Sequence, residues 1–172
     1  MTTVLMGIVR KWLPFMRPRM EISGDRRLRE GMVALEDTWK ETGECSEGDD
    51  WVEVHSGDLE HKFVDGLYVR KVVMPAGMLF TTKIHKVNHP YFMTKGKCRV
   101  LTEEGVEDLE GPHHGITRAG TKRLMYIVEE MTWYTIHATK KKDPAAVERE
   151  VIAKDFSEFD IRDEDVKKLM GT

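Results

Sequence analysis

The stretch from Gly77 to Gly96, GMLFTTKIHKVNHPYFMTKG, decides how the fold of this chain is interpreted. Its apolar residues occur in short runs, and a glycine stands at each end, a pattern typical of short strands joined by turns. Residues two apart on a strand point to the same face, so we expect Lys83 and His85 to share a face. A second histidine, His89, follows on the next predicted strand. The stretch therefore predicts β-structure that carries a small group of polar side chains.

The spacing of this stretch resembles the first motif of the cupin superfamily, Gly-x5-His-x-His-x3-Glu-x6-Gly. Lys83 and His89 stand where the family has its first His and its Glu, and only His85 keeps the family residue. In cupins the two His and the Glu hold a metal inside a small β-barrel. The resemblance thus implies a barrel in which these substitutions either abolished the metal or redesigned the pocket around another ligand.

A second, weaker match lies at Arg118 to Arg123, RAGTKR, which resembles the cupin motif Pro-x-Gly-x-x-His. Gly120 keeps the turn glycine, while Arg118 stands at the Pro position and Arg123 at the position of the ligand His. The resemblance covers roughly residues 66–139 and looks like small cupin-like proteins carried by tailed bacteriophages. It implies a barrel and a phage setting, and it implies no particular reaction.

Short apolar runs bounded by Gly, Pro, Asn or Asp continue along most of this region and predict an all-β barrel. The predicted fold is mainly β: a single cupin barrel (double-stranded β-helix or jelly roll) with a helical N-terminal lead and a helical C-terminal tail. Residues 99–109 predict a hairpin, with Gly105 in its turn. The predicted division is an N-terminal arm (1–24), a helical lead and loop (25–60), the barrel (61–139) and the helical tail (140–172).

Helical periodicity marks the two flanking parts. A helix is expected from about Asp25 to Glu41, capped by Ser23 or Asp25. In the tail, Asp143 followed by Pro predicts the start of a helix that runs to about Lys154, and residues 160–170 predict another.

The chain has 172 residues, of which 40% are hydrophobic and 33% are charged, and its net charge is −3. These values fit one soluble globular domain and argue against nucleic acid as a partner. Cys45 and Cys98 have no zinc-binding spacing, so the expected location is cytoplasmic: the host cytoplasm for a phage protein, with the virion as the alternative. The apolar run 4–9 is too short to span a membrane, and we expect it to pack on the barrel or on a neighbouring subunit. Weak anchoring at a membrane surface is the alternative.

His85 and His89 are the candidate metal ligands and the candidate catalytic residues. Neutral imidazole suits a divalent transition metal such as Zn, Fe, Ni, Cu or Mn. Two ligands are rarely enough, so a third must come from elsewhere in the chain. The candidates are His137, named first, and His61, His113 and His114, of which the last two are expected on a loop.

The cations Lys83 and Arg123 argue for a different occupant, because two positive charges beside a divalent cation are unfavourable unless an anion intervenes. They would suit a carboxylate, a phosphate or a nucleotide. Tyr91 and Arg70 are further candidate ligand-binding residues. A third interpretation is a barrel without any ligand, whose polar side chains are satisfied internally.

Three functions follow from these alternatives. The first is a metal-dependent isomerase, epimerase or lyase acting on a sugar-like or other small polar metabolite. A dioxygenase is less favoured, because iron usually needs three protein ligands and the family's Glu is absent. The second is a module that binds an anionic small molecule without converting it. The third is a phage structural or assembly protein that uses the barrel for oligomerisation. The expected partners are a small-molecule ligand and a second copy of the chain in a homodimer, and no membrane.

Overall fold

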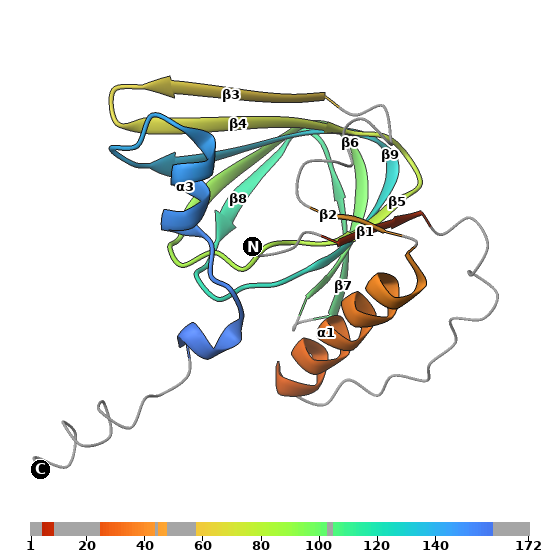
Figure 1. Ribbon diagram of the computed structural model, residues 1–172. Coiled ribbons are helices and arrows are strands. Elements are labelled where there is room, and N and C mark those ends of the chain that lie inside the picture. Colours follow the sequence, from red (N-terminus) through yellow and green to blue (C-terminus); the bar gives the residue numbers. More distant parts are fainter. Residues whose placement is uncertain (1–4, 9–24, 44, 48–57, 103–104, 160–172) are drawn as a thin grey trace, which may run out of the picture.

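The computed structural model describes residues 5–8, 25–43, 45–47, 58–102 and 105–159, and within them the fold is a mainly antiparallel β-barrel (Figure 1). The first strands in the chain are β1 (Leu5–Ile8), β2 (Cys45–Glu47), β3 (Asp58–Val64), β4 (Leu67–Met74) and β5 (Met78–Thr81). The remaining strands are β6 (His89–Thr102), β7 (Gly105–Glu110), β8 (His113–Thr117) and β9 (Leu124–Ala138). The helices are α1 (Asp25–Thr42), α3 (Pro144–Val151) and a 3₁₀ turn, η1 (Phe156–Phe159).

The long strands β6 and β9 belong to both sheets of the barrel. The first part of β6 pairs with β8 and with the last part of β9, whereas its second part pairs with β7 and with the first part of β9. In turn, β4 pairs with the end of β9 and β5 with its beginning. Two sheets that share two strands in this way form a jelly-roll barrel, so the predicted fold class is confirmed.

The change of sheet along β6 occurs where its register with β9 shifts, between Met93 and Cys98. Gly96 lies in this segment with φ +96°, and a Cβ atom there would lie 2.3 Å from the carbonyl oxygen of Glu130. Only glycine combines this backbone conformation with such a close approach. The last glycine of the motif stretch is therefore needed for the strand to bend.

Helix α1 packs against the barrel through an apolar stripe that includes the buried residues Leu28, Met32 and Trp39. Its limits agree with the predicted helix to within one residue at the C-terminal end. The alternative cap, Ser23, lies outside the described residues.

Helix α3 starts as predicted, with the Asp143 side chain accepting a hydrogen bond from the Ala146 amide and Pro144 in the first turn. It ends at Val151, three residues before the predicted end, because the backbone of Ile152 becomes extended and forms a β-bridge with His85. Two more backbone hydrogen bonds join this segment to residues 84–86: Lys86 N–H to Val151 O and Ala153 N–H to Ile84 O. The predicted helix at 160–170 lies outside the described residues.

One local prediction was wrong. His113 and His114 lie on strand β8, where they pair with Met93 and Phe92 of β6, and not on a loop. The turn before them is confined to Gly111 and Pro112, so pairing begins immediately afterwards.

At the N-terminus, residues 5–8 form β1, which pairs with β5 and so joins this part of the arm to the chain's own barrel. The rest of the arm lies outside the described residues, and the division into four parts stays a prediction. Among the described residues, no helix is both long and apolar enough to cross a membrane.

Candidate metal centre

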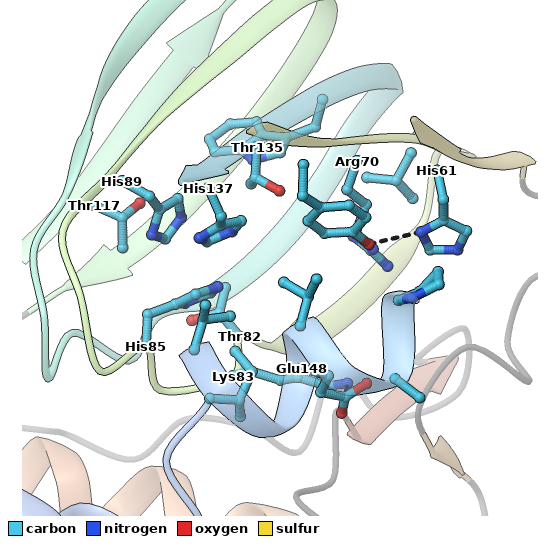
Figure 2. Close-up of a pocket in the computed structure, with 18 of the residues that line it drawn as sticks. His61, Arg70, Thr82, Lys83, His85, His89, Thr117, Thr135, His137 and Glu148 are labelled. Atoms are coloured by element: carbon cyan, nitrogen blue, oxygen red, sulfur yellow. Dashed lines mark hydrogen bonds and ion pairs between the residues drawn. The ribbon is translucent and has the colours of Figure 1, made fainter. Parts of the chain in front are cut away.

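Three imidazoles meet inside the barrel, as Figure 2 shows, and each comes from a different part of the chain. His85 lies in the segment between β5 and β6, His89 is the first residue of β6, and His137 lies near the end of β9. One ring nitrogen from each histidine can be chosen so that all three lie within 4.8 Å of one another. Among the residues that the structure describes, no other set of three or more histidine, cysteine or carboxylate side chains has such geometry.

Strand pairing explains how these residues come together. Tyr91 of β6 pairs with Thr135 of β9 in antiparallel register, and continuing that register by two residues places His89 opposite His137. Their ring centroids are 4.3 Å apart. His85 is held beside them by its bridge to Ile152, with its ring centroid 4.1 Å from that of His89.

The cluster is buried, and burial sets its charge. His89 and His137 are 2% and 4% exposed. Burial, reinforced by the neighbouring imidazoles, lowers the pKa of His85 to about 2. Burial also lowers the pKa of His89 and that of His137 to about 4. All three rings are therefore neutral near pH 7, the form in which imidazole binds a metal.

The Nδ1 atoms of His85, His89 and His137 are buried and lack a hydrogen-bond partner. An unsatisfied buried polar atom costs about 1–3 kcal/mol, so three in one cluster are unusual. A bound divalent metal would satisfy ring nitrogens of such a cluster without requiring any proton. The donor set therefore fits a transition metal, for which histidine is the commonest protein ligand.

The cluster opens into a cavity of about 430 Å³ lined by both sheets and by α3. This volume is within the usual range for small-molecule sites. Much of the lining is apolar and includes Val72, Phe80, Met125, Trp133 and Val147. The cavity can thus hold a small organic molecule next to the histidines.

Three of the predicted cationic residues line this cavity. The Lys83 ammonium is 2.5 Å from Oε1 of Glu148 on α3, so its charge is paired within the cavity wall. Arg123 donates from Nη1 to the hydroxyl of Thr117 at 3.0 Å, and Arg70 reaches the cavity from β4. The ion pair of Lys83 weakens the electrostatic objection to a metal, because one of the two opposing charges is compensated.

The cavity wall contains a second polar group outside the histidine cluster. Nδ1 of His61 and the hydroxyl of Tyr68 share a hydrogen bond of 2.6 Å. The Tyr68 ring lies between this bond and the cluster, with its centroid 6.2 Å from that of His137. Figure 2 shows Arg70 on the same side as His61.

The structure separates the predicted residues into two groups. His85, His89, His137, His61, Lys83, Arg123 and Arg70 all line the cavity. Tyr91 does not line it: its ring stacks on Trp133 and its hydroxyl lies 3.1 Å from Nε2 of His113. The fourth candidate ligand, His114, stacks on Phe92 and also lies elsewhere.

Several lining residues were missed by the sequence analysis. They are the hydroxyl residues Thr82, Thr117 and Thr135 and the acidic residues Asp143 and Glu148. Thr135 stands two residues before His137 on β9, so strand periodicity alone could have suggested it. Glu148 gave no such signal, because it reaches the cavity only through the docking of α3.

No protein-family model matches the chain, and no curated protein matches it. Among solved structures, the chain is similar to an acetylacetone dioxygenase from Acinetobacter johnsonii, with 23% identity and a TM-score of 0.41. That match covers 48% of this chain and 62% of the dioxygenase, so the chain spans less than two thirds of its length.

Two further structures are similar to this chain. Ectoine synthase from P. lautus matches with 10% identity and a TM-score of 0.46, over 55% of this chain and 71% of that one. A cupin-2 domain-containing protein from Shewanella frigidimarina matches with 10% identity and a TM-score of 0.40, over 47% and 79%. Similarities at these low values assign no activity to this chain.

Proposed function

We propose that the protein is a metal-dependent enzyme acting on a small polar or anionic metabolite, with the metal held by His85, His89 and His137. The observation that carries this proposal is the cluster of three imidazoles, from each of which one ring nitrogen can be chosen so that all three lie within 4.8 Å of one another, and each of which has a buried Nδ1 atom without a hydrogen-bond partner. Three protein ligands leave coordination positions open, as in catalytic zinc sites, whereas structural zinc sites are closed by four. Zn, Fe, Ni and Mn are the proposed metals.

A divalent metal at this place would supply Lewis acidity toward an oxygen atom of the ligand. The low pKa values of His85 and His89 favour their role as metal ligands over the role of acid and base near pH 7. Glu148 presents a carboxylate at the cavity wall and, once released from its ion pair with Lys83, is the candidate to accept a proton from the ligand. The cavity wall around Trp133 is apolar. An isomerase, epimerase or lyase needs such a positioned base and a stabilised oxygen.

One observation favours the second candidate, a binding module without a metal. Arg70, Lys83 and Arg123 all line the cavity, and guanidinium groups recognise carboxylates and phosphates directly. The use of the barrel as a phage assembly platform, the homodimer and the cytoplasmic location stay predictions.

Metal analysis of untagged protein, purified without added metal, tests the proposal. We expect about one equivalent of a transition metal in the wild type and in His114→Ala, since His114 is exposed and outside the cluster. The variant His137→Ala should lose the metal while keeping the wild-type circular dichroism spectrum.

A metal-free wild type would contradict the enzyme proposal. If phosphate or carboxylate ligands then raised its Tm, the binding module would be favoured. Metal retained at the wild-type level in His85→Ala, His89→Ala and His137→Ala would place the metal elsewhere.

A further inference from the structure

The cavity has two polar ends. Figure 2 shows Thr117, His89 and His137 toward one end, and Arg70 with His61 toward the other. Because Arg123 donates a hydrogen bond to Thr117, its guanidinium belongs to the histidine end. One guanidinium group thus lies at each end of the same cavity.

The wall between these ends carries Tyr68 and Thr135. In register, Tyr68 of β4 stands opposite His137 of β9, and Arg70 stands opposite Thr135. Apolar lining residues are also present, among them Val72 and Val147, which are buried at 3% and 0% exposure. A short carbon chain can contact the Tyr68 ring and this apolar lining without burying unsatisfied polar atoms. The cavity therefore suits a molecule whose polar ends are joined by a short carbon chain.

The end at Arg70 is rich in hydrogen-bonding groups. Arg70 of β4 stands opposite His61 of β3 in register, and the Tyr68 hydroxyl is hydrogen-bonded to the same imidazole. A guanidinium offers five donors in a planar fork, which lets it bind an anion while it keeps other interactions. A carboxylate or phosphate is the group that this combination recognises best.

Both guanidinium groups act electrostatically on the histidine cluster. Arg70 and Arg123 line the same cavity as the three histidines, and Arg123 is hydrogen-bonded to Thr117 beside them. The same positive charges would repel a divalent metal in the cluster. An anionic ligand that contacts both guanidinium groups would relieve this repulsion, so metal and anion should strengthen each other's binding.

We propose that the cavity binds a small dianion, with one anionic group at Arg123 beside the histidine cluster and the other at Arg70, joined by a short carbon chain. A dicarboxylate or a phosphorylated carboxylic acid is the chemical class. For the anionic group at Arg123, the inference rests on the proposed function, in which a metal is bound by the histidine cluster. For the anionic group at Arg70, it rests on the pairing of β3 with β4.

Calorimetric titration with dicarboxylates of two to five carbons, and with monocarboxylates of the same lengths, tests the inference. The metal content of each sample is measured alongside. We expect at least one dicarboxylate to bind the wild type about tenfold or more tightly than its monocarboxylate counterpart. Arg70→Gln should remove this preference, while Arg70→Lys should keep part of it.

Lys71→Gln is the matched control, because Lys71 is the next residue on β4 and pairs with Glu60 outside the cavity. It should behave as the wild type. Metal-loaded protein that binds both ligand classes equally, or an Arg70→Gln variant that keeps the preference, would overturn the inference. Protein without metal that still prefers dicarboxylates through Arg70 would contradict the proposed enzyme and support the dianion site.

Discussion

Single residues set the chemistry of this barrel, and the three clustered histidines are the central example. All three are held neutral, His89 and His137 are buried, and each of the three has a buried Nδ1 atom without a partner. Neutral imidazoles cost less to bury than charged ones, but they still lose their hydrogen bonds to water. The cluster is thus tolerable near pH 7 and becomes unfavourable in acid.

We predict that the metal-free protein loses stability as the pH falls from about 6.5 toward 4. Well above pH 6.5, the ordinary pKa of histidine, the three rings are neutral in both the folded and the unfolded state. Below pH 6.5, the histidines of the unfolded chain become protonated, whereas His89 and His137 of the folded protein stay neutral because their pKa values are about 4. Each such group contributes a slope of up to about 1.4 kcal/mol per pH unit.

Urea unfolding between pH 7.5 and 5 measures this slope, in a range where most carboxylates stay ionised. The variant His137→Gln should be less sensitive to pH than the wild type, and His114→Gln should be equally sensitive. An equal slope in wild type and His137→Gln would show that the cluster is not the cause.

The motif stretch predicted two of the three clustered histidines, His85 and His89. His137 was one of four candidates, and the sequence could not select it because its position depends on the register between β6 and β9. Such long-range pairing is not encoded in any local pattern. For the same reason, Tyr91 was an expected ligand-binding residue although its side chain points toward Trp133.

Among the elements, α3 connects the tail of the chain to the site. Its residues Val147 and Glu148 form part of the cavity wall, and its last turn is hydrogen-bonded to the segment that carries His85. The stability of this short helix should therefore affect the cavity directly.

We predict that Asp143→Ala loosens α3. The Asp143 side chain caps the helix by accepting a hydrogen bond from the Ala146 amide at 2.8 Å, and loss of such a cap typically costs about 1 kcal/mol. Hydrogen exchange should become about fivefold faster at the amides of Val147 and Ile152. Asp155→Ala is the control, because that side chain bonds to Ser157 beyond the helix. Unchanged protection in Asp143→Ala would show that the cap does not hold α3 in place.

Local patterns predicted most elements well. The hairpin between β6 and β7 has Gly105 at its turn with φ +121°, as its sequence indicated, and α1 has the expected limits. The misplacement of His113 and His114 has a physical cause: glycines on both sides resemble a loop, whereas pairing with β6 decides the conformation. A partner strand elsewhere in the chain overrode the local preference.

On the scale of the whole molecule, α1 is connected to the barrel by a buried ion pair. The Lys122 ammonium lies 2.6 Å from Oε1 of Glu36, with the two side chains only 6% and 11% exposed. The Thr81 hydroxyl also donates a hydrogen bond to Glu36. Helix and barrel thus share one ion pair from which water is largely excluded.

We predict that Lys122→Met lowers the free energy of unfolding by about 3–5 kcal/mol, because it leaves the Glu36 carboxylate buried without its counter-ion. The double variant Glu36→Leu/Lys122→Met should recover most of this loss, since it removes both charges. Lys40→Met should change stability by less than about 1 kcal/mol, because Lys40 pairs with Asp37 at 3.9 Å on the exposed surface. Chemical denaturation measures all three, and a double variant as unstable as Lys122→Met would contradict this account of the ion pair.

The β-bridge between His85 and Ile152 has a consequence for the timing of binding. Together with the hydrogen bonds of Lys86 and Ala153, it makes the end of α3 and the segment around His85 one mechanical unit. An outward movement of α3 that admits a ligand would therefore also disturb one of the three clustered imidazoles. Ligand entry and metal escape would then share a single opening event, so the mean time between openings sets a lower limit on the residence times of both.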